Sequence, residues 1–362
     1  MKYKVDKSIR PAYLQIYRQI KDDIINGNYA YSSKLPSKRL LADETETSTV
    51  TVEHAYALLC DEGYVESRER SGFFVIFRGS DGFALPPVTE IRAASHHSHS
   101  SPDFPFSVLA RTMRNVISDL GDAILEKSQN KGCPELRLAI KHYLSRNRGI
   151  NVDVEQIVIG SGAEYLYGLI IELLGRGRTY GIEYPSYKKI EQVYRASEVA
   201  YDPLPLSADG IDSAALAGTS ASVLHTTPYR SFPTGVSASA SKRHEYIRWS
   251  NAGGRYIIED DFESEFSVST KPEDTLFALS SGGNVIYLNT FSKTISPSLR
   301  IGYMVLPQKL VSDFDERLGF YSCTVPTFEQ HVVARLIAGG DFERHINKVR
   351  RDKRKELAGG KE

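Results

Sequence analysis

The spacing of apolar residues in the first eighty positions predicts a small helical domain. Apolar side chains recur at helical spacing over residues 11–26, and Gly27 follows where a helix commonly ends. Ser37 stands where an N-cap would begin a second short helix, and residues 47–62 show a third amphipathic pattern that stops at Gly63. The pattern therefore predicts three helices, the last two joined by a short turn.

The residues that follow predict a two-stranded wing. Residues 64–77 are β-prone at both ends, and the pair Ser71 and Gly72 between them is typical of a turn. Helix, turn, helix and wing form one compact unit. We therefore predict a winged helix-turn-helix domain over residues 1–79.

Beyond this unit the pattern changes twice. Residues 80–104 are rich in Ser, Pro, Gly and His and lack periodicity, which predicts a linker. The histidines at 96, 97 and 99 have no other ligand-type side chain nearby in sequence, so no metal site is predicted there. From residue 105 to 362, helical stretches alternate with short β-rich runs such as "QIVIGSG" and "NVIYLNT". This alternation predicts an α/β domain whose mostly parallel sheet is covered by helices.

Composition adds limits to this picture. The 362 residues suit about two domains. The 45 Lys and Arg balance 45 Asp and Glu, and residues 1–79 hold 12 of the basic against 11 of the acidic residues. Since phosphate neutralisation dominates DNA affinity, a DNA-binding surface must be local.

The cysteines and the apolar runs indicate a cytoplasmic protein without a membrane segment. Cys60, Cys133 and Cys323 are odd in number and far apart, which predicts neither a disulfide framework nor a metal cluster. The N-terminus lacks an apolar signal core. The longest apolar run, "YLYGLIIELLG", is interrupted by Glu172 and is too short to span a bilayer.

The first module resembles the winged helix-turn-helix of GntR-type bacterial regulators. The stretches "IYRQIKDDIINGNY", "KLPSKRLLADE" and "TVTVEHAYALLCDEGYVESRERSGFFV" carry the likeness. It implies a double-stranded DNA operator as partner, with the third helix in the major groove. The expected DNA-binding residues are Lys34, Ser37, Lys38, Arg39, Thr49, Thr51, Arg68 and Arg70. The alternative is a winged helix used for protein contact or dimerisation.

The second module contains the pieces of a pyridoxal phosphate site. In "TFSKTISPSLRIGY", Lys293 precedes Arg300 by seven positions. The run "YIIEDDFESEF" ends a predicted strand with Asp260, which lies 33 positions before Lys293, and open α/β sheets place ligands at such strand ends. The cofactor requires an amine, an acid opposite its ring nitrogen, a ring stack and a phosphate cup. In "GSGAEY", small residues open a helix whose amides can receive phosphate.

Together with "YPSYKKI" and "PYRSFPTGV", these motifs resemble the fold type I aminotransferase domain, and the whole chain resembles the MocR/GabR family of transcriptional regulators. The resemblance implies pyridoxal 5′-phosphate as cofactor, held in an internal aldimine by Lys293 with Asp260 at the pyridinium proton. It also implies a homodimer, because fold type I pockets form at a subunit interface. The expected cofactor-binding residues are Ser161, Gly162, Ala163, Tyr187, Asp260, Thr290, Ser292, Lys293 and Arg300.

Several positions depart from the family pattern. Phe262 replaces a tyrosine that bonds the cofactor's phenolic oxygen, Phe232 replaces the asparagine of "NPTG", and Lys127 stands where a tyrosine is common. The chain is also expected to lack the small C-terminal domain whose arginine grips a substrate carboxylate. Fewer donors near the aldimine favour a sensor over an efficient catalyst.

Three functional hypotheses follow. The leading one is a regulator that binds DNA and senses an amine, an amino acid or pyridoxal phosphate through Lys293. The alternative is a pyridoxal phosphate-dependent aminotransferase with an appended DNA-binding domain, which measurable amino-group transfer would reveal. The third is a winged-helix repressor whose large domain only dimerises, which the absence of a cofactor absorption band would favour.

Overall fold

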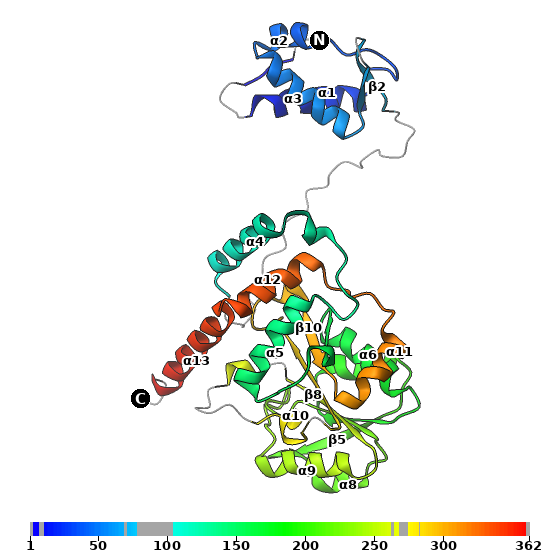
Figure 1. Cartoon of the computed structure of the whole chain (residues 1–362), viewed down its shortest axis with the longest axis vertical. Coiled ribbons are helices and arrows are strands. Elements are labelled where there is room, and N and C mark those ends of the chain that lie inside the picture. Colours follow the sequence, from blue (N-terminus) through cyan, green and yellow to red (C-terminus); the bar gives the residue numbers. More distant parts are fainter. Residues whose placement is uncertain are drawn as a thin grey trace. The chain divides into compact units, whose positions relative to one another are not determined.

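The computed structural model describes residues 3–6, 11–68, 71–77, 104–261, 264–267, 274–281 and 283–359. The chain divides into two compact units, residues 1–97 and 98–362, and each is described by itself (Figure 1). Arg70, Phe262 and the three linker histidines lie outside the described residues. Within the described ranges, no helix combines the length and apolar character that a bilayer crossing requires.

The first unit is a winged helix-turn-helix, as the sequence predicted. Ser37 caps its second helix by accepting a hydrogen bond from the Leu40 N–H at 3.2 Å. Gly27 and Gly63 follow the first and third helices with φ of 78° and 76°, a conformation that suits glycine. The elements are α1 (Ala12–Ile25), α2 (Lys38–Thr45), α3 (Thr49–Asp61), β1 (Val65–Arg68) and β2 (Gly72–Val75), with the two strands antiparallel.

The apolar faces of the three helices meet in one core. Ile16, Ile20, Leu41 and Val52 are buried there, and all four lie at the periodic positions of the sequence pattern. Tyr56 is also buried, and its hydroxyl donates to the Pro36 carbonyl at 2.8 Å. This bond holds the segment before α2 against α3.

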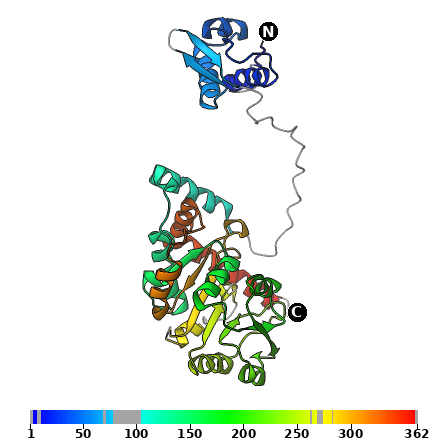
Figure 2. The same ribbon diagram turned by 90° about the vertical axis from the view of Figure 1, so that its right-hand side faces the viewer.

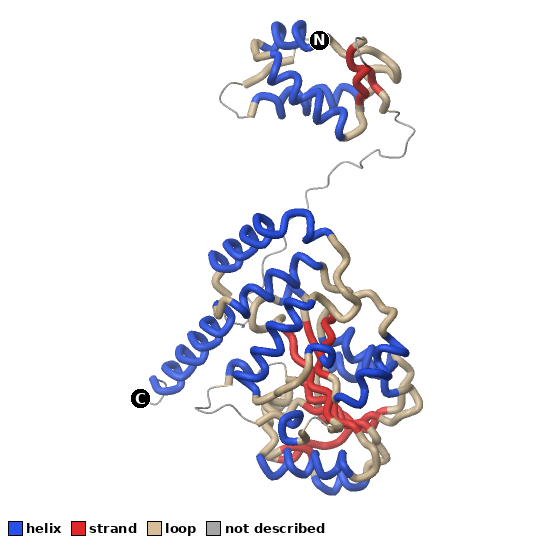
Figure 3. Tube along the Cα trace, viewed as in Figure 1, coloured by secondary structure: helices blue, strands red, loops and turns tan. Residues whose placement is uncertain are grey.

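The second unit is built on a mostly parallel eight-stranded sheet with helices on both faces (Figure 3). Its strands are β3 (Ile157–Gly160), β4 (Tyr180–Tyr184), β5 (Tyr201–Ser207), β6 (Gly210–Ile211), β7 (Val223–Thr226), β8 (Tyr256–Asp260), β9 (Val285–Thr290) and β10 (Gly302–Val305). The order across the sheet is β3-β10-β9-β8-β7-β4-β5-β6. Strands β4, β5, β7, β8 and β9 run parallel, whereas β10 is antiparallel to both its neighbours and β6 is antiparallel to β5.

The helices of this unit connect and cover the strands (Figures 1 and 2). They are α4 (Phe106–Leu120), α5 (Pro134–Arg148), α6 (Ala163–Leu174), α7 (Lys188–Ala196), α8 (Ser213–Gly218), α9 (Ala240–Asn251), α10 (Leu276–Leu279), α11 (Val311–Leu318), α12 (Thr327–Ala338) and α13 (Asp341–Gly359). Short 3-10 turns are η1 (Gly121–Leu125), η2 (Val154–Gln156), η3 (Ser264–Phe266), η4 (Pro297–Leu299) and η5 (Gln308–Leu310).

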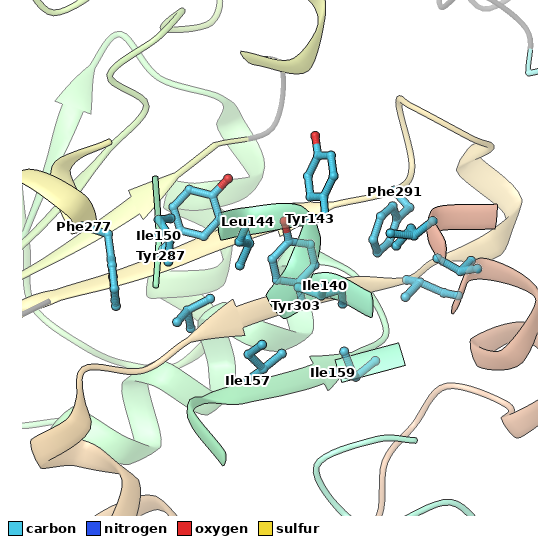
Figure 4. Close-up of a cluster of buried hydrophobic side chains, with 14 of the residues drawn as sticks. Ile140, Tyr143, Leu144, Ile150, Ile157, Ile159, Phe277, Tyr287, Phe291 and Tyr303 are labelled. Carbon is cyan, nitrogen blue, oxygen red and sulfur yellow. The ribbon is translucent and has the colours of Figure 1, made fainter. Parts of the chain in front are cut away.

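Each face of the sheet has its own hydrophobic core. On one face, side chains such as Ile159, Tyr287 and Tyr303 pack with Ile140 and Tyr143 of α5 (Figure 4). On the other face, α6, α7 and α11 cover alternate residues of the same strands, including Val158, Ile258, Ile286, Leu288 and Met304. Because side chains alternate along a strand, neighbouring residues of β8 reach opposite layers.

Both ends of the second unit pack into the first of these cores. Phe104 is buried with its ring 4.9 Å from that of His345 on α13. The basic run "HINKVRRDKRKEL" lies within α13. Its apolar face buries Phe342, Ile346 and Val349.

Candidate functional site

A cavity of about 250 Å³ opens at the carboxyl ends of β8 and β9 in the second unit. Asp260 ends β8 and Thr290 ends β9, so the parallel pair delivers both side chains to one edge of the sheet. The cavity is lined by Ala163, Glu164, Tyr167, Ser186, Tyr187, Ile190, Thr227, Phe232, Asp260, Thr290, Ser292, Lys293 and Arg300. Its position is the one that parallel α/β sheets favour for ligands.

A buried carboxylate lies at the inner end of the cavity. Tyr167 of α6 donates its hydroxyl hydrogen bond to Asp260 Oδ2. The His225 Nε2 atom lies 3.6 Å from the same oxygen, and His225 Nδ1 is 2.8 Å from the Tyr194 hydroxyl. Burial and the neighbouring carboxylate raise the pKa of Tyr167 well above its ordinary value, so it remains a donor. Among the described residues, Asp260 Oδ1 has no hydrogen-bond partner.

Lys293 lies in a turn that directly follows β9. Phe291 and Ile295 on either side of it are buried, and the Ile295 N–H donates to the Phe291 carbonyl at 2.9 Å. These apolar anchors fix the turn, and Lys293 lines the cavity together with Ser292. The backbone therefore holds Lys293 at the carboxyl end of β9, next to the end of β8 where Asp260 lies.

Two aromatic side chains line the outer part of the cavity. Tyr187 and Phe232 are 40% and 55% exposed, and their ring centroids lie 6.0 Å apart in an edge-to-face arrangement. Glu183, buried at the end of β4, holds the loop that carries Phe232. It accepts hydrogen bonds from the hydroxyls of Thr227 and Ser231 at 2.5 and 2.7 Å. This buried carboxylate therefore positions one wall of the cavity.

Two charged side chains of the cavity lining, Glu164 and Arg300, form an ion-pair cluster with Lys189, which lies just outside the lining. An Arg300 guanidinium nitrogen lies 2.8 Å from Glu164 Oε2, and Lys189 Nζ lies 2.9 Å from Glu164 Oε1. Burial alone would raise the pKa of Glu164, but hydrogen bonds from Lys189, from the residue's own backbone N–H and from Arg300 outweigh it and lower that pKa to about 2. A Cβ added at Gly162 would lie 2.7 Å from the same guanidinium, and the φ of 99° at Gly162 is one that residues with a side chain rarely adopt.

The structure brings together most of the cofactor-binding residues expected from the sequence. Ala163, Tyr187, Asp260, Thr290, Ser292, Lys293 and Arg300 all line the cavity. Gly162 lies against Arg300, whereas Ser161 is partly exposed and outside the lining. Sequence reasoning missed Glu164 and Tyr167. Tyr167 follows Ala163 by four positions on α6, so helical spacing was the signal that would have found it.

On the other face of β8, buried charges form a second cluster. Arg148 at the end of α5 makes a buried ion pair with Asp261, and the Tyr287 hydroxyl donates to Asp261 Oδ2 at 2.7 Å. Glu265 accepts a hydrogen bond from the Asn289 amide at 2.6 Å. Burial, followed by repulsion from Asp261, raises the pKa of Glu265 to about 7.

Glu259 belongs to the same face and is also shifted. Its carboxylate accepts hydrogen bonds from the Tyr229 hydroxyl at 2.5 Å and from the backbone N–H groups of Leu276 and Phe277 at 2.7 and 2.9 Å. Burial nevertheless raises the pKa of Glu259 to about 7. Two acids in this layer therefore stay protonated up to a higher pH than ordinary glutamates do.

These raised pKa values predict that stability falls as pH rises. Between the ordinary glutamate pKa of 4.5 and a folded pKa of about 7, the folded state binds more protons than the unfolded state, so the free energy of unfolding decreases with pH. One such group contributes at most about 1.4 kcal/mol per pH unit. In Glu265→Gln, we expect a shallower decrease between about pH 5 and pH 7, measured by urea unfolding. An unchanged slope would contradict the assignment.

A third grouping lies away from the cavity. The ligand-type atoms of Cys133, Glu135 and His331 lie within 4.8 Å of one another, although the sequence predicted no metal cluster from its separated cysteines. Burial raises the pKa of the Cys133 thiol to about 11. The thiol is therefore protonated in the metal-free protein, and we assign no role to this grouping.

In the first unit, the predicted DNA-binding residues that the structure describes lie just before or on α2, on α3 and on strand β1 of the wing. Arg39 and Thr49 are exposed, and Thr51 is partly buried with its Oγ1 2.8 Å from the Ser48 hydroxyl. Ser37 serves as the cap of α2. The exposed face of α3 also contains residues that sequence reasoning did not single out, namely Val50, Glu53, His54 and Ala57.

Two of the predicted DNA-binding cations are paired with carboxylates. Lys38 Nζ lies 2.6 Å from Glu53 Oε1, and an Arg68 guanidinium nitrogen lies 2.5 Å from Glu66 Oε1. Arg68 also packs over Phe74, 4.4 Å from the ring centroid. Lys34 is exposed beside the wing, where it forms a β-bridge with Phe74. Phosphate contacts by Lys38 and Arg68 would therefore compete with resident carboxylates.

Comparisons with known proteins identify both units. Residues 12–75 match the bacterial regulatory proteins of the gntR family, and residues 100–358 match aminotransferase class I and II. The chain is 33% identical to the HTH-type transcriptional regulator YdeL of Bacillus subtilis, over 96% of this chain and 78% of that protein. It is 28% identical to the probable rhizopine catabolism regulatory protein MocR of Rhizobium meliloti, over 94% and 74%.

A solved structure supports the fold of the second unit. Kynurenine aminotransferase of Pyrococcus horikoshii superposes with a TM-score of 0.62 at 27% identity, covering 70% of this chain and 66% of that chain. The chain thus spans just under two thirds of that enzyme's length.

The aminotransferase class I and II fold points to pyridoxal 5′-phosphate as the cofactor, and the cavity residues fit it. The partnerless Asp260 Oδ1 is a buried acceptor for a protonated ring nitrogen, and Arg300 beside Gly162 is a cation for a phosphate. The matches to YdeL and MocR extend over both modules of this chain. The chain therefore belongs to the MocR-type GntR regulators, which join a helix-turn-helix domain to an aminotransferase class I and II domain.

Proposed function

We propose that the protein is a pyridoxal phosphate-dependent transcriptional regulator. It binds operator DNA through residues 1–79 and responds to an amine, an amino acid or pyridoxal phosphate through residues 105–362. The observation that carries the proposal is a cavity that gathers Lys293, Asp260 and Arg300 in a chain that also contains a winged helix-turn-helix. Contact with chromosomal DNA places the protein in the cytoplasm.

The cavity residues have separate roles toward the cofactor. When bound, pyridoxal phosphate supplies an electron-withdrawing ring with an aldehyde that reacts reversibly with primary amines. Lys293 provides the amine of the protein. Tyr167 fixes the Asp260 carboxylate, so that Oδ1 would be able to accept a hydrogen bond from the protonated ring nitrogen. Tyr187 provides an aromatic face for the ring.

Regulation requires that the effector bind two states of the protein with different affinities. An amine that competes with Lys293 changes which charges and hydrogen bonds the cavity contains, so its binding energy can bias the second unit. A homodimer would present two winged helices to a repeated operator, with half-sites separated by whole helical turns. Size-exclusion chromatography with light scattering checks the dimer.

The test of the whole proposal is DNA binding in the presence of cofactor. Binding sites would be selected from random duplex DNA with the full chain, and the affinity for the selected DNA would then be measured with pyridoxal phosphate and with a panel of amines and amino acids. The proposal expects at least one of these compounds to change the affinity. Absence of sequence-selective binding under all conditions would reject it.

The substitution Arg39→Ala is expected to weaken DNA binding by roughly three- to tenfold at moderate salt, because it removes one exposed cation near a phosphate. The slope of log affinity against log salt should fall by about one. Mobility-shift titrations at several salt concentrations measure both. Arg18→Ala, which removes an exposed arginine of α1 outside the predicted contact set, is the matched control. Equal affinities for the two variants would remove Arg39 from the contact surface.

Measurement of amino-group transfer distinguishes the aminotransferase alternative from the proposed regulator. Phe232 lines the cavity where its ring cannot donate a hydrogen bond, which supports a binding function over efficient catalysis. We expect little or no amino-group transfer from amino acids to keto acids in the purified protein. Steady turnover that Lys293→Ala abolishes would instead favour the enzyme.

A further inference from the structure

The phosphate end of the cavity contains an anion of the protein itself. Glu164 lies in the first turn of α6, with one carboxylate oxygen bound to Arg300 and the other to Lys189. Arg300 follows the turn η4 with a positive φ of 48°, and its guanidinium lies against Gly162 at the start of the same helix. Two cations and a helix N-terminus therefore converge on one carboxylate.

This arrangement is a ready-made site for an anion. The exposed N–H groups at the start of a helix attract negative charge, and arginine binds carboxylate and phosphate with the same fork of donors. Hydrogen bonds from Lys189, from the residue's own backbone N–H and from Arg300 keep the pKa of Glu164 near 2 against the effect of burial, so the carboxylate is ionised at every physiological pH. The group that Arg300 would offer to a phosphate is thus already engaged.

We propose that Glu164 is a built-in competitor of the cofactor's phosphate group and keeps the affinity for pyridoxal phosphate low. The inference rests on the proposed function, because it concerns the same cavity. The side chains of Arg300, Lys189 and Glu164 together carry one net positive charge, whereas an incoming phosphate carries nearly two negative charges. The phosphate must share Arg300 with Glu164 or displace the carboxylate, and in either case it meets a like charge.

A weakened site suits a sensor. A protein that binds its cofactor very tightly is saturated at all times and cannot report on cofactor concentration. With Glu164 present, the fraction of protein that has bound pyridoxal phosphate changes at higher cofactor concentrations than it would without Glu164. We expect the effect to be specific to the phosphate group, because Asp260, Tyr187 and Lys293 would hold the ring and the aldehyde. The ratio of the affinity for pyridoxal phosphate to that for pyridoxal is therefore smaller than it would be if Arg300 had no carboxylate partner.

The test compares two ligands in the substitution Glu164→Gln, which keeps the shape of the side chain and removes its charge. We expect the Kd for pyridoxal phosphate to fall by roughly three- to tenfold, the range for loss of a partly exposed ion pair together with a like charge. The Kd for pyridoxal should stay unchanged. Both are measured on the full chain by absorbance and fluorescence titration. The gain for pyridoxal phosphate should shrink as salt is added.

A matched control is available on the same helix. Glu172 pairs with Arg176 at the far end of α6, outside the cavity lining, so Glu172→Gln should leave both affinities unchanged. Glu164→Ala should shift the affinity for pyridoxal phosphate in the same direction as Glu164→Gln. Thermal unfolding of each variant verifies that it is folded.

The outcomes separate the two proposals. If Glu164→Gln leaves the affinity for pyridoxal phosphate unchanged or weakens it, Glu164 serves to orient Arg300 and the inference is overturned. If the wild type binds no pyridoxal phosphate, the proposed function fails, and inorganic phosphate then decides the inference. Greater thermal stabilisation of Glu164→Gln than of the wild type by phosphate supports the competitor role, and equal stabilisation overturns it.

Discussion

Replacement of Lys293 by alanine is expected to remove the visible absorption band that the protein shows with pyridoxal phosphate. It should also abolish the cofactor that remains attached after borohydride reduction and denaturation. The reason is geometric, because Lys293 is the amine that lines the cavity at the strand ends that present Asp260. The loss should be complete, since no other lysine lines this cavity in the described part of the chain.

Lys189 provides the matched control for this experiment. It is a second amine close to the cavity, held by Glu164 at 2.9 Å. Lys189→Ala should retain a reducible, covalently attached cofactor. Peptide mapping of the reduced wild type should place the label on Lys293. A label on Lys189, or a band of equal size in Lys293→Ala, would contradict the assignment.

The substitution Arg148→Met is expected to lower the free energy of unfolding of the second unit by about 3–5 kcal/mol. Arg148 and Asp261 are both buried, with side chains 4% and 0% exposed, and removal of the guanidinium leaves an uncompensated charge beside Glu265. The substitution also removes the contact of the guanidinium with the Tyr229 ring, 5.0 Å away. Urea unfolding followed by circular dichroism measures the change.

A double mutant separates charge from packing. If the cost comes from the stranded carboxylate, Arg148→Met combined with Asp261→Asn should recover part of the lost stability. Arg176→Met, which removes an exposed partner of Glu172, should cost at most about 0.5 kcal/mol. A loss in Arg148→Met no larger than in Arg176→Met would show that the buried pair contributes little.

The main features of the candidate site were predictable because they depend on local order. Asp260 follows a β-rich run, and a strand that ends in a carboxylate places it at the ligand edge of a parallel sheet whatever the neighbouring strands are. Lys293 and Arg300 lie in one short segment after β9. The capping of α2 by Ser37 was likewise a local signal that the structure confirms.

Other features depend on which elements pack together, which the sequence did not show. Tyr167 reaches Asp260 only because α6 covers the face of the sheet to which that carboxylate points. Glu164 reads as an ordinary charged residue in the first turn of a helix until Arg300 is brought against it from another part of the chain. The pairing of Lys38 with Glu53 depends on the angle between α2 and α3 in the same way.

The acidic run at the end of β8 illustrates the difference most clearly. The sequence shows three consecutive acids, Glu259, Asp260 and Asp261, without indicating which of them face the same way. The structure directs Asp260 to the cavity and the other two to the opposite layer. The period of two along a strand is general, but only the packing of α6 and α5 determines which layer is which.

The antiparallel strand β10 has a consequence for synthesis of the protein. Strand β3, which leads into α6 and so into Gly162 and Glu164, pairs in the sheet with β10 alone. Residues 157–160 must therefore wait on the ribosome until residues 302–305 have emerged. Such long-range pairing slows folding and leaves an unpaired strand exposed in the meantime. The nascent chain can complete its winged helix early, but the cavity beside α6 cannot form before residues 302–305 have been synthesised.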